Sequence, residues 1–232
     1  MTWFEDFAKF AHSNLTEEIV ESLNVRGVSD EQVEQFNIGY VNKKLPPDCP
    51  LDFTKQFHGG DKLSHMYCFP LSNTIGQIKG FQFRPVNRAI RGYQDYVNQH
   101  GEPILFGLGQ AMPHVWETGT ITVVEGVFDL FPLQRHLGST VACLSAHIPE
   151  SMIRTMGRLC KKIILGFDND PTGRRSSIEF QREYKNKYEI VDLGAKYPKT
   201  PMPNGKVVKD PGDLWEVWGD AKVGELVSRW CK

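Results

Sequence analysis

The sequence lacks a long apolar segment and an export signal. No apolar run in its 232 residues approaches the roughly 20 residues that a membrane-spanning helix requires. The N-terminal stretch MTWFEDFAKFAH carries Glu5 and Asp6 where a signal peptide has basic residues. We therefore expect a cytoplasmic protein with no membrane partner.

Paired cysteines are also missing. The five cysteines are widely spaced and form no C-x-x-C pair: Cys49, Cys68, Cys143, Cys160 and Cys231. An odd, dispersed set is typical of reduced thiols and lacks the spacing of a structural zinc site, so no zinc is expected.

Charge of one sign is not in excess, because 27 Lys and Arg residues stand against 28 Asp and Glu residues. This balance excludes a general attraction of the whole surface to nucleic acid. A local basic groove remains open.

The patterns that are present change character near residue 118. Before it, residues 14–25 and 28–36 predict short helices with Thr16 or Asn14 and Ser29 as caps. The runs MYCFPLS, QIKGFQFRP and RGYQDYVN predict strands, and SNTIGQ predicts a hairpin turn between the first two.

From Thr120 onward, short β-branched runs alternate with helical segments, which is typical of a mostly parallel sheet covered by helices. The predicted fold class is α/β, with an α+β N-terminal subdomain over residues 1–117 and an α/β domain over 118–212. Residues 213–232 form a predicted helical tail, in which Leu214, Val217 and Trp218 share an apolar face.

Acidic residues follow two of the predicted parallel strands. Glu125 ends ITVVEG and Asp168 ends KIILGFD, so both belong to the sheet edge where ligands bind. Asp170 follows two residues after Asp168, and Asp129 lies four residues after Glu125. Crowded carboxylates need a cation, and oxygen ligands without Cys or His suit Mg²⁺ or Mn²⁺. The alternative for Asp170 is that it caps the helix that Pro171 begins.

Basic residues gather in two places. Lys79, Arg84, Arg88 and Arg91 follow one another without an intervening acid, and Asn98 lies nearby. On a strand, Phe81 and Phe83 would share one face while Gln82 and Arg84 share the other, which predicts an outward electrostatic track for single-stranded nucleic acid. A solvated sheet face is the alternative.

The second basic set is suited to phosphate. Arg174 and Arg175 lie in the first turn of the helix after Asp170, where backbone amides also attract anions. These arginines and Lys209 are candidate nucleotide-binding residues. Pairing with Asp168 or Asp170 is the structural alternative.

Several of these segments resemble a known family. VVEGVFDLF and LGFDNDPTGRRS resemble the two acidic signatures of the TOPRIM domain. LNVRGVSDEQVEQFNIGY, GQIKGFQFRPV, PILFGLGQA and VKDPGDLW resemble, in order, motifs of the catalytic core of bacterial-type (DnaG-like) primases.

The resemblance implies roles for the acids. Glu125 would be a metal ligand or general base, Asp168 and Asp170 the metal-binding pair, and Asp129 and Asp210 further acids of the family. Two positions depart from the family pattern: Gly212 replaces an acid, and Asp95 replaces a lysine. The zinc-binding and helicase-docking modules of such primases are not expected here, as in a compact primase of phage or mobile-element origin or an excised core.

The function implied is a DNA-directed RNA polymerase of the primase type, a nucleotidyltransferase that makes short RNA primers. Its expected partners are a single-stranded DNA template, nucleoside triphosphates, and a replicative helicase or a separate zinc-binding protein, in the cytoplasm of a bacterium or a phage-infected host. The alternatives are a TOPRIM metal-dependent nuclease and an inactive module that binds single-stranded nucleic acid.

Overall fold

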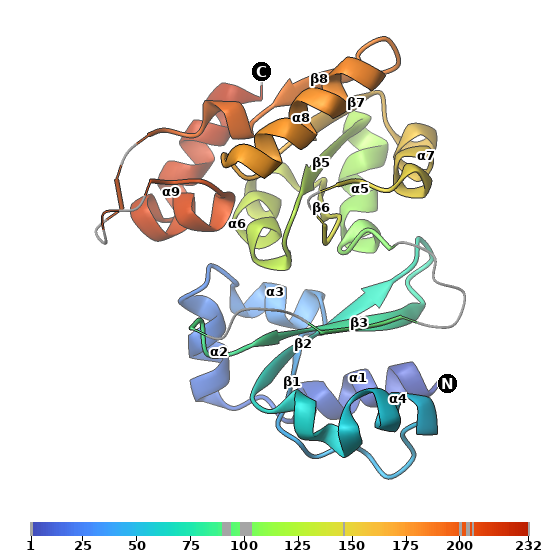
Figure 1. Cartoon of the computed structure of the whole chain (residues 1–232). Helices are drawn as coiled ribbons and strands as arrows, with labels where there is room; N and C mark the ends of the chain where they lie inside the picture. The colour runs from blue at the N-terminus through green and yellow to red at the C-terminus, as the bar shows by residue number, and fades with distance from the viewer. Residues whose placement is uncertain are drawn as a thin grey trace. The chain divides into compact units, whose positions relative to one another are not determined.

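The structure is a computed structural model that describes residues 2–89, 94–97, 104–145, 147–199, 201–202, 205 and 207–231, with residues 94–97 described by their backbone only. The chain forms two compact units, Met1–Gly101 and Glu102–Lys232 (Figure 1). This division lies upstream of the predicted boundary at residue 117. The reason is that helix α5 (Leu108–Thr118) buries Leu108, Met112 and Val115 in the same core as the parallel sheet.

The first unit is built on an antiparallel sheet of order β1-β2-β3-β4. The predicted hairpin is confirmed, since Phe83 pairs with Cys68 and Phe81 with Pro70 across β2 and β3. The strands are β1 (Gly39–Val41), β2 (Met66–Ser72), β3 (Ile78–Pro85) and β4 (Gln94–Val97). The helices are α1 (Trp3–Ser13), α2 (Glu17–Asn24), α3 (Asp30–Gln35), α4 (Leu51–Gln56) and the 3₁₀ helix η1 (His58–Leu63).

Capping explains where two of these helices begin. The Thr16 hydroxyl accepts a hydrogen bond from the Ile19 amide at 3.4 Å, and the Ser29 hydroxyl accepts one from the Gln32 amide at 3.3 Å. Both caps satisfy amides that have no partner inside the helix. The predicted α2 and α3 are therefore confirmed with their caps.

Aromatic side chains hold α1 and α4 on one face of this sheet. The ring centroids of Phe7 and Phe81 lie 4.8 Å apart, and those of Phe53 and Phe7 lie 5.0 Å apart. Their burial, together with that of Phe83, supplies the core of the unit.

The other face of the same sheet is also covered, which corrects one prediction. The Tyr67 hydroxyl lies 2.8 Å from the Ser22 hydroxyl of α2, and Figure 1 shows α2 and α3 over the sheet opposite α1 and α4. Gln82, predicted to point outward beside Arg84, is only 2% exposed. The outward track is therefore narrower than the strand pattern predicted.

The second unit contains a parallel sheet of order β6-β5-β7-β8, as predicted. The strands are β5 (Thr120–Val124), β6 (Thr140–Ala142), β7 (Lys162–Leu165) and β8 (Glu189–Asp192). The chain runs from β5 to β6 on one side and then to β7 on the other, so the strand order reverses between β5 and β7. Ligands of such sheets bind beyond the carboxyl ends of the strands at this point.

Helices cover both faces of the parallel sheet. Side chains of α5, α7 (Glu150–Leu159) and α8 (Pro171–Tyr184) share one core with Val123 and Leu165, and α6 (Val127–Leu137) packs against α9 (Pro211–Trp230) on the opposite face (Figure 1). The predicted tail is thus helical and belongs to the second unit, where Leu214 is buried. A short 3₁₀ helix, η2 (Gly194–Lys196), follows β8. Across the described residues, no helix is long and apolar enough to cross a membrane.

Candidate active site at the ends of beta5 and beta7

Glu125 and Asp168 come together at the reversal point of the sheet. Strands β5 and β7 are neighbours, with Val123 paired to Leu165, so the residues that follow them emerge side by side. The backbone amide of Asp168 donates a hydrogen bond of 3.2 Å to Glu125 Oε1. The structure therefore brings together the two acids that the sequence placed on separate strands.

Asp170 caps helix α8. Its Oδ1 accepts hydrogen bonds from the amides of Thr172 at 2.9 Å and Gly173 at 3.0 Å, as the structural alternative predicted. Gly173 also permits the close approach of α8, because a Cβ there would overlap the Asp168 carbonyl and lie 2.8 Å from Glu125 Oε1. The cap engages one carboxylate oxygen of Asp170 and leaves the role of the other open.

The loop before α9 adds a fourth acid, Asp210, and a cation, Lys209. Asp210 caps α9 through a 2.7 Å hydrogen bond from the Asp213 amide to its Oδ1. The Lys209 ammonium lies 2.7 Å from Asp168 Oδ2 and 3.0 Å from Asp210 Oδ2. Lys209, a predicted nucleotide-binding residue, thus neutralises two predicted metal-binding acids.

Asp129 lies behind this group at the start of α6. Its Oδ2 accepts a hydrogen bond of 3.1 Å from the Gly126 amide. Burial raises the pKa of Asp129 well above its ordinary value, and the charges of Asp210 and Asp168 raise it further. A cation beside these carboxylates would relieve their repulsion.

Burial and the neighbouring charges also raise the pKa values of Glu125 and Asp168 at the edge of the sheet. Burial, with the charges of Asp168 and Asp170 adding to it, raises the pKa of Glu125 from 4.5 to about 7. Burial also raises the pKa of Asp168, although the hydrogen bond from Lys209 lowers it in part. Carboxylates with raised pKa values in one cluster are typical of functional sites.

The donor chemistry of this edge fits a hard divalent cation. Glu125, Asp168 and Asp170 offer carboxylate oxygens, and each has one oxygen that the described hydrogen bonds and ion pairs do not engage. The Lys209 ammonium already serves as a stand-in cation on Asp168. Within the part of the chain that the structure describes, no three Asp, Glu, His or Cys side chains are arranged at metal-binding distances, so an ion would have to draw them together.

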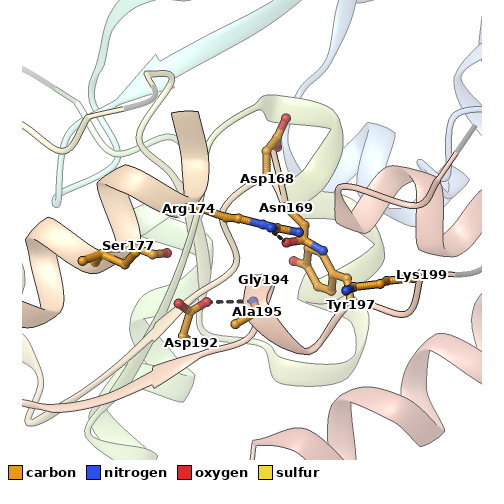
Figure 2. A pocket seen from close by; sticks show the side chains of 10 residues that line it. Asp168, Asn169, Arg174, Ser177, Asp192, Gly194, Ala195, Tyr197 and Lys199 are labelled. Atoms are coloured by element: carbon orange, nitrogen blue, oxygen red, sulfur yellow. Dashed lines mark hydrogen bonds between the residues drawn. The ribbon is translucent and has the colours of Figure 1, made fainter. Parts of the chain in front are cut away.

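A pocket of about 330 Å³ is lined by Asp168, Asn169 and Arg174, among others (Figure 2). Figure 2 shows Arg174 reaching from α8 to Asn169, and Arg174 Nε donates a 2.6 Å hydrogen bond to Asn169 Oδ1. Arg175 is exposed on the same first turn. Neither arginine forms an ion pair with Asp168 or Asp170 in the described structure, unlike the structural alternative.

The predicted basic track lies in the first unit. Lys79 and Arg84 on β3 are half-buried, and Arg88 is exposed. The predicted contributors Arg91 and Asn98 lie outside the described residues. Asp95, one of the two departures from the family pattern, lies on β4 with its backbone paired to Gln82.

Arg26 is a member of this basic group that the strand pattern did not identify. Its guanidinium lies 5.7 Å from the centre of the Tyr67 ring. Burial lowers its pKa to about 10, and the charges of Arg88 and Arg84 contribute to the lowering. In the sequence, Arg26 lies within LNVRGVSDEQVEQFNIGY, one of the segments that resemble the primase core.

Comparison with known proteins is consistent with this geometry. Residues 122–206 match the Toprim-like family. The DNA primase of Rickettsia typhi is 26% identical over 95% of this chain, and the alignment covers 40% of that protein. The DNA primase of Thermotoga maritima is 24% identical over 92% of this chain, again covering 40% of the relative. The chain thus spans about two fifths of the length of these relatives.

Solved structures share the fold over nearly the whole chain. A DNA primase domain from Pseudomonas aeruginosa matches with a TM-score of 0.74 at 20% identity, covering 98% of this chain and 78% of that one. A DnaG primase catalytic domain bound to ssDNA matches with a TM-score of 0.69 at 19% identity, covering 97% and 77%. At these identities the similarity demonstrates the fold.

Proposed function

We propose, from the premise that this chain is a DnaG-like primase core with a TOPRIM domain, that it makes short RNA primers on single-stranded DNA by divalent-metal-dependent nucleotidyl transfer. One observation carries the proposal: Glu125 and Asp168 meet at the reversal point of the parallel sheet, with Asp170, Asp129 and Asp210 around them. Nucleotidyl transfer requires a concentration of negative charge that can hold Mg²⁺ or Mn²⁺ against phosphate oxygens.

The acids and arginines would divide the work. Glu125, Asp168 and Asp170 hold the ion, which when bound supplies positive charge for the phosphates and lowers the pKa of the attacking hydroxyl. The alternative role of Glu125 is that of a general base that accepts the proton of that hydroxyl. Arg174 and Arg175 orient the triphosphate from the first turn of α8.

The template contacts belong to the first unit. Lys79, Arg84 and Arg88, together with Arg26, present positive charge suited to a phosphate backbone. Arg91 and Asn98 extend this set along the sequence. One structure with this fold is described as bound to ssDNA, which supports single-stranded DNA as the template. A replicative helicase or a zinc-binding protein is the proposed helper.

The test is a primer-synthesis assay with single-stranded DNA, labelled ribonucleotides and Mg²⁺ or Mn²⁺. Asp168→Asn removes the charge while keeping the side-chain shape, so synthesis should fall by about a thousandfold or more. Glu179→Gln, which removes one charge from the exposed surface of α8, is the control.

Each outcome of this assay indicates a different function for the chain. Labelled oligomers from the parent chain and none from the Asp168 variant support the primase. A shortened template would indicate a TOPRIM nuclease, and retention of DNA without either product would indicate a binding module. Synthesis by Asp168→Asn at the parent rate would contradict the proposed role of the carboxylates.

A further inference from the structure

The Lys209 ammonium supplies a positive charge between two acids of the candidate site. Its ammonium lies within 3.0 Å of two carboxylates that belong to different elements, Asp168 after β7 and Asp210 before α9. The two acids are 17% and 16% exposed, whereas the lysine side chain is 49% exposed. The charge of Lys209 is therefore directed inward, although much of its side chain faces solvent.

The backbone fixes Lys209 in this place. Its carbonyl accepts a hydrogen bond of 2.6 Å from the Asn169 amide, next to Asp168, and its own amide donates to Asp213 Oδ2 at 3.0 Å. Asp210 is held in turn as the cap of α9. These contacts join the loop before α9 to the end of β7, so the ion pair is part of the folded framework.

In the neighbouring turn, the Asp213 carboxylate accepts the hydrogen bond from the Lys209 amide, and Gly212 contributes no carboxylate. Gly212 has no side chain, and a Cβ there would lie 3.3 Å from Asp210 Oδ1 and 3.5 Å from Asp129 Oδ1. The carboxylates around Asp210 therefore have Lys209 as their fixed counter-charge. In the described structure, Lys209 forms ion pairs with Asp168 and Asp210 and none with Glu125 or Asp170.

We infer that Lys209 is a built-in cation that takes the place of a second divalent ion beside Asp168 and Asp210. An exchangeable ion then binds on the side of Glu125 and Asp170 alone, and the resting site takes one ion. This inference rests on the proposed function, because that function supplies the exchangeable ion. Lys209 is a positioning residue, and its effect on the number of bound ions is measurable without catalysis.

The experiment measures Mn²⁺ binding to the full chain by electron paramagnetic resonance. The parent protein should bind about one Mn²⁺ tightly, and Lys209→Met should bind about one more, because removal of the ammonium exposes two carboxylates to the metal. Lys209→Arg keeps the charge and should bind as the parent does. Lys199→Met is the matched control, since Lys199 lines the pocket beside Asp168 and forms no ion pair in the described structure.

Thermal unfolding supplies a second readout. In EDTA, Lys209→Met should melt several degrees below the parent, because two partly buried carboxylates lose their partner. Excess Mg²⁺ should raise its melting temperature by more than it raises that of the parent or of Lys199→Met. If the Lys209→Met variant is folded only with Mg²⁺, that result also supports the inference.

Two results would overturn the inference: two tight Mn²⁺ ions in the parent, or equal binding and equal Mg²⁺ response in the parent and Lys209→Met. If neither protein binds Mn²⁺, the ion of the proposed function is wrong as well. If the change in ion number is observed and the parent makes no primers, the proposed function fails alone.

Discussion

Glu125→Gln should stabilise the protein at alkaline pH when no divalent ion is present. The substitution keeps the shape of the side chain and an oxygen that can accept the 3.2 Å hydrogen bond from the Asp168 amide. It removes a negative charge that is partly buried beside Asp168 and Asp170. Charge is therefore the main difference between the two proteins.

The pKa of Glu125 sets the size and the direction of the effect. It is raised from 4.5 to about 7, so between these values the folded protein binds more protons than the unfolded chain, and its stability falls as pH rises. At about 1.4 kcal/mol for each pH unit, the upper limit is about 3 kcal/mol. Because the side chain is partly exposed, solvent screening reduces the expected gain to about 1–2 kcal/mol above pH 8. Below pH 4.5 the gain should vanish.

The assay is urea unfolding in EDTA between pH 4 and pH 8.5, followed by tryptophan fluorescence. This signal reports mainly on the second unit, which contains four of the five tryptophans: Trp116, Trp215, Trp218 and Trp230. Glu179→Gln, at an exposed position of α8, is the control for loss of a charge. A Glu125→Gln variant that is less stable than the parent at pH 8, or whose advantage does not change with pH, would refute the reasoning.

Two further substitutions test the separate roles of single side chains. Asp170→Ala should lower stability by about 1 kcal/mol through loss of the α8 cap, while Asp170→Asn keeps a capping oxygen and should lose less than about 0.5 kcal/mol. Both variants should lose primer synthesis, and full synthesis by Asp170→Asn would show that Asp170 is only a cap. Arg84→Ala should weaken binding of single-stranded DNA and make the salt dependence shallower by about one unit of slope. Lys9→Ala, on α1 at the opposite face of the sheet, is its control, and equal affinities would remove Arg84 from the template track.

Local sequence patterns predicted most elements of the second unit. The predicted alternation of strands and helices after Thr120 is confirmed, and the strand before Glu125 is β5. These predictions succeed because period and capping act over a few residues. Helix α1 was not predicted, although its buried residues Phe4, Phe7, Ala8 and Ala11 recur at helical spacing. The exposure predicted for Gln82 was wrong, since its side chain is only 2% exposed.

The acids at the sheet edge were accessible to sequence reasoning because parallel strands place their carboxyl ends together. Alternation of strands and helices therefore predicted that Glu125 and Asp168 would meet. For Lys209, the sequence left open whether it binds nucleotide or pairs with Asp168, and the structure shows the pair. Lys209 is 41 residues away in the chain, and the ion pair forms only because the loop before α9 is hydrogen-bonded to the end of β7.

Residue types and their periodicity thus specify the kind of sheet and the chemistry of its edge, since both depend on short-range rules. Which charges neutralise one another, and how many of them remain for a metal ion, depends on contacts between segments far apart in the chain. Electrostatic energy varies with the distance and burial of each pair, and the folded structure alone sets both.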